Sequence, residues 1–184
     1  MKSLQKSFFN KSTIEVAKAL LGCSLVHETK EGISIGKIIE TEAYLQDDPA
    51  SHSFKGKTKR NEAMFGSSGR AYVYFTYGMY NCFNVSTNKE GIGEAVLIRA
   101  LEPVKGVELM KKRRQVENIG ELCDGPAKLV IAMGITKKHN NANLANGNLR
   151  IIKGEKIPNN KIIKTARIGI SKGIELPYRF ILKE

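Results

Sequence analysis

The chain has 184 residues, of which 41% are apolar, and its 30 Lys and Arg against 18 Asp and Glu give a formal net charge of +12. This length and apolar content fit one globular domain with a buried core and exclude an intrinsically disordered chain. The positive charge fits two readings equally well: a polyanionic partner, most simply nucleic acid, or a basic surface that only aids solubility.

The first part of the chain predicts a helix and two strands. Residues 12–21 favour a helix because they begin with the Ser-x-x-Glu spacing of a capping box, and Gly22 can end it. Residues 23–28 and 33–44 favour strands around a Glu-Gly turn. The polar segment 45–70 is predicted to be a long loop with a short helix near its end, and long loops in compact domains are often functional.

Residues 71–87 form the window with the strongest strand signal. Aromatic and β-branched residues crowd both sides of Gly78, which predicts strands at 71–76 and 80–86 joined by a short turn. Tyr77 then lies near the tip of a hairpin. It either folds back onto a neighbouring loop or projects as a probe that enters a partner.

The second half of the chain continues the mixture of strands and helices. The patterns predict a strand at 95–101 and a helix at 104–115 whose last turn is basic, as suits a helix C-terminus. Pro126 opens a further helix. Later strands are predicted near 151–152, 162–170 and 179–181. Without a visible repeat or linker, the result is a single mixed α/β domain.

The cysteines and histidines are few and scattered. Cys23, Cys82 and Cys123 indicate reduced thiols in the cytosol that pack as small apolar side chains. Neither Cys-x-x-Cys nor His-x-x-x-His spacing occurs, so no metal site is expected. No apolar run approaches the roughly 18 residues of a membrane span, and the N-terminus lacks a signal-peptide core, so no membrane association is expected.

Charged residues interrupt two of the predicted apolar strands. Alternation along strand 33–44 places Glu40, Glu42 and Tyr44 on one face. Arg99 lies within a Val-Leu-Ile strand and needs a carboxylate partner if it is buried. These residues form either a structural ion pair or a general base, held ionised beside an aromatic platform, that orients a water molecule.

Five of the six tyrosines lie between residues 44 and 80, close to His52 and several basic residues. Most of these rings are expected in the core, but such a cluster also suits base stacking. Together with the charged pair, it fits an enzyme that takes a base out of a duplex and attacks it in a pocket. A non-catalytic nucleic-acid-binding module fits equally well at this point.

A series of short motifs, ordered along nearly the whole chain, then narrows the choice. The motifs are Ala19-Leu20-Leu21-Gly22, Glu40-Thr41-Glu42-Ala43-Tyr44, Ser51-His52, Arg60-Asn61, Met64-Phe65, Tyr72-Val73-Tyr74, Tyr77-Gly78-Met79, Asn84, the run from Leu97 to Pro103, Gly125-Pro126, Lys128-Leu129, Arg167-Ile168-Gly169-Ile170 and Arg179-Phe180. In their number and order they resemble the alkyladenine (3-methyladenine) DNA glycosylase family.

The resemblance implies a monofunctional glycosylase. Such an enzyme flips an alkylated purine, or in some relatives a deaminated or etheno-adducted one, out of double-stranded DNA. It hydrolyses the N-glycosidic bond and initiates base-excision repair. The implied fold is a single compact α+β domain over residues 1–184, with a curved antiparallel β-sheet, a protruding β-hairpin and flanking helices. The protein is expected to act as a monomer without cofactor or metal, in the cytoplasm and at the nucleoid.

The resemblance also implies roles for individual residues. Glu42 looks like the base that activates water, and Arg99 resembles the group that helps to hold that water. The other implied roles are base-slot walls at Tyr44, His52 and Tyr74, a filter against the guanine 2-amino group at Asn84, a minor-groove wedge at Tyr77, and DNA-backbone contacts at Lys128 and Arg167. Two alternatives remain: a non-catalytic nucleic-acid-binding domain of the same fold, and a glycosylase/lyase that uses a lysine.

Overall fold

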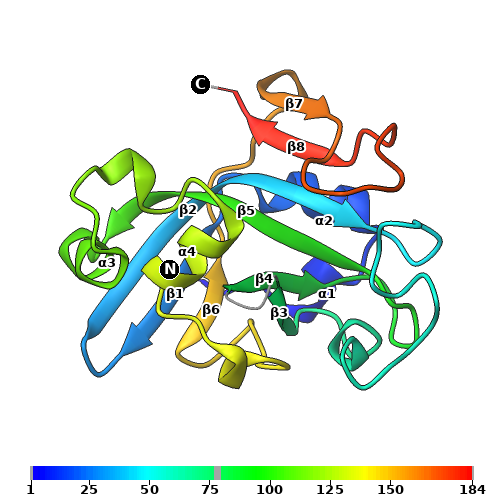
Figure 1. Cartoon of the computed structure of the whole chain (residues 1–184), viewed down its shortest axis with the longest axis horizontal. Helices are drawn as coiled ribbons and strands as arrows, with labels where there is room; N and C mark the ends of the chain where they lie inside the picture. Colours follow the sequence, from blue (N-terminus) through cyan, green and yellow to red (C-terminus); the bar gives the residue numbers. More distant parts are fainter. Residues whose placement is uncertain (1, 77–79, 184) are drawn as a thin grey trace.

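The computed structural model describes residues 2–76 and 80–183 and shows a curled antiparallel β-sheet with helices packed against it (Figure 1). Within these ranges the main path of the sheet has the strand order β3-β4-β5-β2-β1-β6, and β8 adds to β2 and carries β7. The strands are β1 (Ser24–Thr29), β2 (Gly32–Tyr44), β3 (Ala71–Thr76), β4 (Tyr80–Ser86), β5 (Ala95–Lys105), β6 (Leu149–Ile152), β7 (Ile162–Thr165) and β8 (Arg179–Leu182).

The α-helices of the described residues are α1 (Lys6–Phe9), α2 (Thr13–Leu20), α3 (Val107–Arg114) and α4 (Pro126–Ala132). Short 3-10 turns lie at Glu62–Met64, Ile119–Glu121, Lys137–His139 and Asn159–Lys161. None of the described helices is long and apolar enough to cross a membrane. The mixed α/β fold with an antiparallel sheet therefore agrees with the fold expected from the sequence.

Strand β2 is the element around which the sheet curls. Its first half pairs with β1, from Gly32 to Lys37, and its second half pairs with β8, from Glu40 to Glu42. Its other edge pairs with β5, with register irregularities around residues 38–41. A bulge of this kind increases twist, which bends β2 away from β1 and makes room for β8 beside the functional end of the strand.

Local sequence accounts for the ends of the helices. The Ser12 hydroxyl caps α2 by accepting a bond from the Glu15 N–H at 3.4 Å, which is one of the two bonds of the predicted capping box. The Glu15 carboxylate accepts a bond from the Ser12 hydroxyl at 2.7 Å. Gly22 ends this region with a φ of +81°, a conformation that other residues rarely adopt. Before α3, Gly106 has a φ of +75°, and a Cβ there would come within 2.3 Å of the Ile33 carbonyl oxygen.

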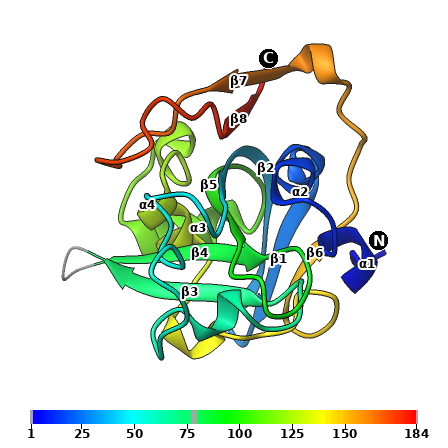
Figure 2. The same ribbon diagram turned by 90° about the vertical axis from the view of Figure 1, so that its right-hand side faces the viewer.

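The core lies between the sheet and the helices. In both views α2 and α4 lie on opposite sides of β5 (Figures 1 and 2). The largest fully buried side chains come from helices and strands alike, among them Leu20, Ile38, Phe83, Leu129 and Phe180. At about 25 cal/mol per Å² of apolar surface, these contacts are the main source of stability and make the sheet a rigid support for the loops at its edge.

Strands β3 and β4 form the predicted hairpin, whose arms extend from the body of the molecule (Figure 2). The register pairs Tyr72 with Asn84 and Tyr74 with Cys82. Tyr77, predicted at the tip, lies outside the described residues. Its role as a wedge therefore stays a prediction.

Several predicted boundaries differ from the structure, among them the helix expected from residue 104, which begins only at Val107. The strand that was expected to end at 101 continues to Lys105, because its last residues pair with the start of β2. The strand expected at 162–170 was wrong beyond Thr165, where β7 ends. After Thr165 the chain leaves the sheet edge, and the Ile168 N–H bonds to the side chain of Glu42 instead of a neighbouring strand.

Candidate active site

A cavity of about 510 Å³ opens beside β2, between the β3–β4 hairpin and two loops. Strands β2 to β5 contribute one side of its lining. The segment after β2 contributes Pro49, Ala50 and His52, and the segment between β7 and β8 contributes residues 168–172. Its volume lies in the range that holds a small-molecule ligand, so a single nucleobase would fit.

Glu42 is fully buried and does not itself line the cavity, but it lies in direct contact with residues that do. Its Oε2 accepts a hydrogen bond from the Tyr44 hydroxyl at 2.8 Å, and its Oε1 accepts one from the Ile168 N–H at 3.1 Å. Arg99 Nη1 lies 3.4 Å from Oε1. The three residues that contact the Glu42 carboxylate, Tyr44, Ile168 and Arg99, all line the cavity and therefore lie between the carboxylate and the cavity. Their hydrogen bonds and the positive charge of Arg99 offset the free-energy cost of burying the carboxylate.

Arg99 has the carboxylate partners that its place in an apolar strand required. Its Nε donates to Glu40 Oε1 at 2.9 Å, while its Nη1 is directed to Glu42. Glu40 is also held by Arg179, whose Nε lies 2.5 Å from the same oxygen. Charges of alternating sign therefore run from Arg179 in β8 through Glu40 in β2 to Arg99 in β5. These contacts are consistent with the prediction that Glu40, Glu42 and Tyr44 lie on one face of β2.

Aromatic rings form much of the cavity wall. His52 and Tyr74 meet edge to face with centroids 4.5 Å apart, and the Tyr72 and Tyr74 rings lie 5.3 Å apart. The Tyr72 hydroxyl and His52 Nδ1 are 2.9 Å apart. These contacts lock the rings in one arrangement, as a preformed stacking slot requires.

Burial keeps these side chains uncharged at neutral pH. It lowers the pKa of His52, with a smaller contribution from the positive charge of Arg60. Burial also raises the pKa of Tyr72 to about 12, and burial with the nearby Glu42 carboxylate raises the pKa of Tyr44. Burial is also the main cause of the raised pKa of Tyr74. The aromatic wall therefore brings no positive charge of its own to the cavity.

Asn84 and Cys82 reach the cavity from β4. The Asn84 amide nitrogen donates to the Tyr72 carbonyl at 3.1 Å, which orients the side chain. Cys82, expected only to pack in the core, lines the cavity as well. Strand alternation places it on the same face as Asn84, so this pattern could have identified it. Lys172, to which the sequence analysis gave no role, also lines the cavity.

Two predicted DNA-backbone residues have different environments. Lys128, in α4, is partly exposed and pairs with Asp124 at 2.8 Å. Arg167 is buried, with 4% of its surface exposed, and forms an ion pair with buried Asp48. This enclosed and already bonded guanidinium argues against the phosphate contact expected for Arg167, which stays a prediction. Among the described residues no group of His, Cys, Asp and Glu side chains could hold a metal ion.

Comparison with known proteins identifies the family of this chain. A family model described as methylpurine-DNA glycosylase matches residues 7–184. The chain belongs to the methylpurine-DNA glycosylase family. This membership confirms the resemblance drawn from the sequence motifs and makes the protein a hydrolase that acts on N-glycosyl bonds.

Similar proteins occur in bacteria and archaea. A protein of Carboxydothermus hydrogenoformans is 54% identical over 181 residues, which cover 98% of this chain and 95% of that protein. One of Methanoculleus marisnigri is 48% identical over 184 residues, with coverage of 98% and 95%. One of Francisella tularensis is 50% identical over 175 residues, with coverage of 94% and 91%. Each is named "Putative 3-methyladenine DNA glycosylase".

Proposed function

We propose that this methylpurine-DNA glycosylase binds double-stranded DNA as a monomer, flips an alkylated purine into the 510 Å³ cavity and hydrolyses its N-glycosidic bond. The observation that carries the proposal is the buried Glu42 carboxylate, held by Arg99 and the Ile168 N–H at the wall of an aromatic slot. A nucleic-acid-binding module has no need of an ion pair so placed.

Glu42 acts as the general base. The Arg99–Glu42 contact at 3.4 Å is longer than the 2.7–2.9 Å that is typical of a charge-assisted hydrogen bond. A water molecule that enters between these groups could bond to both, and it would then be aimed at C1′ of the flipped nucleotide. Glu42 takes the proton of this water as the new C–O bond forms, and its charge favours the oxocarbenium-like transition state.

The uncharged aromatic wall suits a cationic base. An alkylated purine carries positive charge and is already a good leaving group, and it stacks favourably between Tyr44, His52 and Tyr74. Because His52 is held neutral by burial, it does not repel such a base. Asn84, oriented by the Tyr72 carbonyl, is expected to disfavour the 2-amino group of unmodified guanine, whereas cationic 7-methylguanine is a good enough leaving group to be released despite it.

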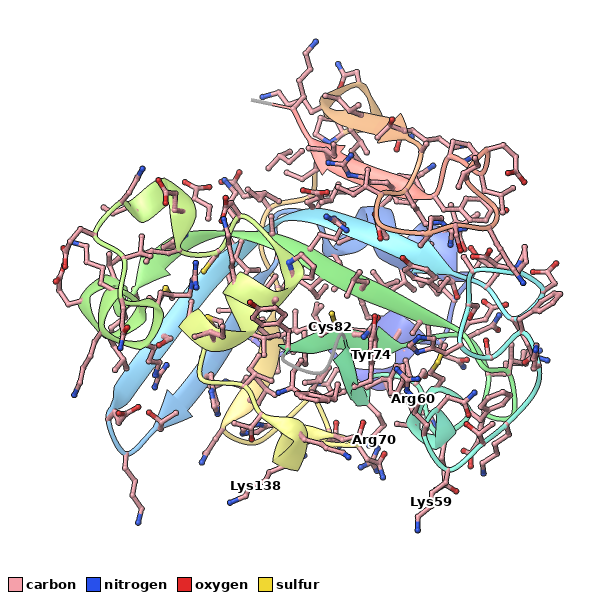
Figure 3. The ribbon with its side chains drawn as sticks, in the orientation of Figure 1. Lys59, Arg60, Arg70, Tyr74, Cys82 and Lys138 are labelled. Atoms are coloured by element: carbon pink, nitrogen blue, oxygen red, sulfur yellow. The ribbon has the colours of Figure 1, made fainter. Side chains whose placement is uncertain are left out.

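The surface around the hairpin offers a path for the DNA backbone. Lys59, Arg70 and Lys138 project from the same side of the molecule as β3, and Arg60 lies close to Tyr74 (Figure 3). We retain Lys128 as a backbone contact and Tyr77 as the wedge, both from the family resemblance. Arg167 is not part of this surface.

The function is tested by base release from duplexes that contain 7-methylguanine, 3-methyladenine, hypoxanthine, ethenoadenine or no lesion. We expect the cationic methylated bases to be released fastest, because neutral bases need protonation to leave. The product strand should stay intact until it is treated with hot alkali. Binding without release from any lesion duplex would favour the non-catalytic module.

The same reactions with borohydride distinguish a lyase. A glycosylase/lyase forms a Schiff base between a lysine and C1′, which borohydride converts to a stable protein–DNA adduct. We expect no adduct. A trapped adduct that disappears in Lys172→Ala would assign the lysine at the cavity as the nucleophile and contradict water as the attacking group.

DNA affinity should depend strongly on salt. If about four phosphates are contacted, the affinity should fall about 100-fold between about 50 and 200 mM salt, because each contact releases condensed counterions. Lys59→Ala should reduce the slope by about one ion. Lys111→Ala, in α3 and paired with Glu108 and Glu117, is the matched control and should leave the slope unchanged. A flat salt response would contradict backbone binding.

A further inference from the structure

A buried ion pair joins the two loops that form the mouth of the cavity. Asp48 lies in the segment after β2, and Arg167 lies in the segment after β7. Arg167 Nη2 donates to Asp48 Oδ1 at 3.0 Å, and its Nη1 donates to the second carboxylate oxygen. Both side chains are at most 1% exposed. This bidentate geometry fixes the two loops relative to each other.

The same guanidinium also bonds the end of β2 and the middle of its own loop. Arg167 Nη1 donates to the Ala43 carbonyl at 3.0 Å, and Nη2 donates to the Gly173 carbonyl at 3.3 Å. The guanidinium carbon lies 4.7 Å from the centre of the Tyr44 ring and 5.5 Å from that of Tyr178. The Tyr44 ring, one wall of the cavity, is therefore backed by a cation that cannot move freely.

Asp48 also accepts a backbone hydrogen bond within its own loop. Its Oδ1 accepts the Ala50 N–H at 2.9 Å, which shapes the turn that brings Pro49, Ala50 and His52 to the cavity. The pair therefore supports lining residues on both loops, although neither Asp48 nor Arg167 lines the cavity.

The residue after Arg167 connects this pair to the catalytic carboxylate. Ile168 donates its N–H to Glu42 Oε1, and the Tyr44 hydroxyl donates to Oε2. Both of these donors are therefore attached to, or backed by, Arg167. A shift of the guanidinium would displace both of them, and a displacement of about 1 Å at a reacting group can cost about 100-fold in rate.

We propose that Asp48 and Arg167 are positioning residues of the glycosylase, which set the orientation of Glu42 and the distance between the walls of the base slot. The proposal rests on the proposed function, because it assigns the pair to the base-release step. It replaces the phosphate contact predicted for Arg167. An arginine is required rather than a lysine, since only a planar guanidinium can bond a carboxylate in two places, donate to two carbonyls and stack on tyrosine.

The test compares Asp48→Asn and Arg167→Lys with the parent enzyme. Rates are measured in single turnovers on a 7-methylguanine duplex at saturating protein, and duplex affinity is measured separately. We expect the rate to fall between about 10- and 100-fold while the affinity stays within about threefold. The amide proton of Ile168, followed by NMR, should move upfield in Asp48→Asn because its bond to Glu42 weakens.

Arg113→Lys is the matched control. Arg113 is a mostly buried arginine, with 12% of its side chain exposed, that bonds Glu31, the Ser34 hydroxyl and the Ala132 carbonyl, and it does not line the cavity. The Arg113→Lys variant should lower the melting temperature, as is expected of the two test variants. It should leave the base-release rate and the Ile168 resonance unchanged. A loss of rate that follows melting temperature alone across all three variants would overturn the proposal.

Other outcomes are equally decisive. If Arg167→Lys weakens duplex binding and lowers its salt slope while the rate is unchanged, Arg167 is a phosphate contact and the proposal is wrong. If Arg167→Lys does not fold, Asp48→Asn alone decides, because an amide keeps the side-chain shape. If the parent protein releases no base, the proposed function fails, and the Ile168 resonance still shows whether the pair orients Glu42.

Discussion

Glu42→Gln is expected to lower the rate of base release at least about 1,000-fold, which corresponds to about 4 kcal/mol of activation free energy. An amide cannot take a proton from water and brings no negative charge to the oxocarbenium-like transition state. The shape of the side chain is unchanged, so the affinity for a lesion duplex should change only about twofold or less. Single-turnover kinetics and a binding titration measure the two quantities separately.

The substitution also changes hydrogen bonding in the wall. The carboxylate accepts one bond on each oxygen, from Ile168 N–H and from Tyr44 O–H, whereas glutamine has a single acceptor oxygen. One donor loses its partner, which costs about 1–3 kcal/mol of unfolding free energy. The hydroxyl of Tyr44 can rotate, so we expect the fixed Ile168 N–H to keep the acceptor. Thermal unfolding should show this loss without a change in fold.

Glu102→Gln is the control for the charge change. Glu102 is a β5 carboxylate that pairs with Lys37 at 3.1 Å, with 57% of its side chain exposed. This variant should keep the parent rate. Near-parent rates in Glu42→Gln would remove Glu42 from the chemistry and return the Glu42–Arg99 pair to a structural role.

Arg99→Met should have the second largest effect, a fall in base-release rate of between about 100- and 1,000-fold. Methionine fills the space but leaves Glu40 and Glu42 without the cation that lies between them. Two carboxylates on one strand face then repel each other, and the bridging site for water loses its donor. The unfolding free energy should fall by about 3–5 kcal/mol, as when one partner of a buried pair is removed.

Arg179→Met separates these two effects. Arg179 bonds Glu40 from β8 but does not line the cavity. Its removal should lower stability while the rate stays within a few-fold of the parent. Equal losses of rate in Arg99→Met and Arg179→Met would mean that Arg99 acts only through the stability of β2. Arg99→Lys should recover stability more than rate, since an ammonium cannot reach both carboxylates in the same geometry.

Patterns of short range in the sequence predicted much of the fold correctly. The capping box before α2, the proline that opens α4 and the alternation of β3 each depend on neighbours within a few residues. For this reason α2, α3, α4 and most strands could be placed from the sequence, whereas α1 was not predicted. The strand expected through residue 170 failed, because β7 has a partner only as far as Thr165 and the next residues bond to a side chain.

The candidate site also has features that could be predicted from the sequence and features that could not. The residue types in strands 33–44 and 95–101 were enough to predict that Arg99 pairs with Glu40 or Glu42, because a buried charge in an apolar strand needs an opposite charge, and the structure shows contacts with both. The motif order was enough to place the chain in its family. The sequence could not show that Asp48, 119 residues before Arg167, is the partner of that arginine.

The amino-acid sequence by itself therefore determined most of the strands, the need of Arg99 for a carboxylate partner, the cluster of tyrosines and the family. The tertiary structure alone decided which of these groups share a cavity, that Glu42 is covered by three donors, and that Arg167 is enclosed. The physical reason is that period and capping are local properties, whereas burial and long-range ion pairs depend on how β2 bends and which loops meet beside it.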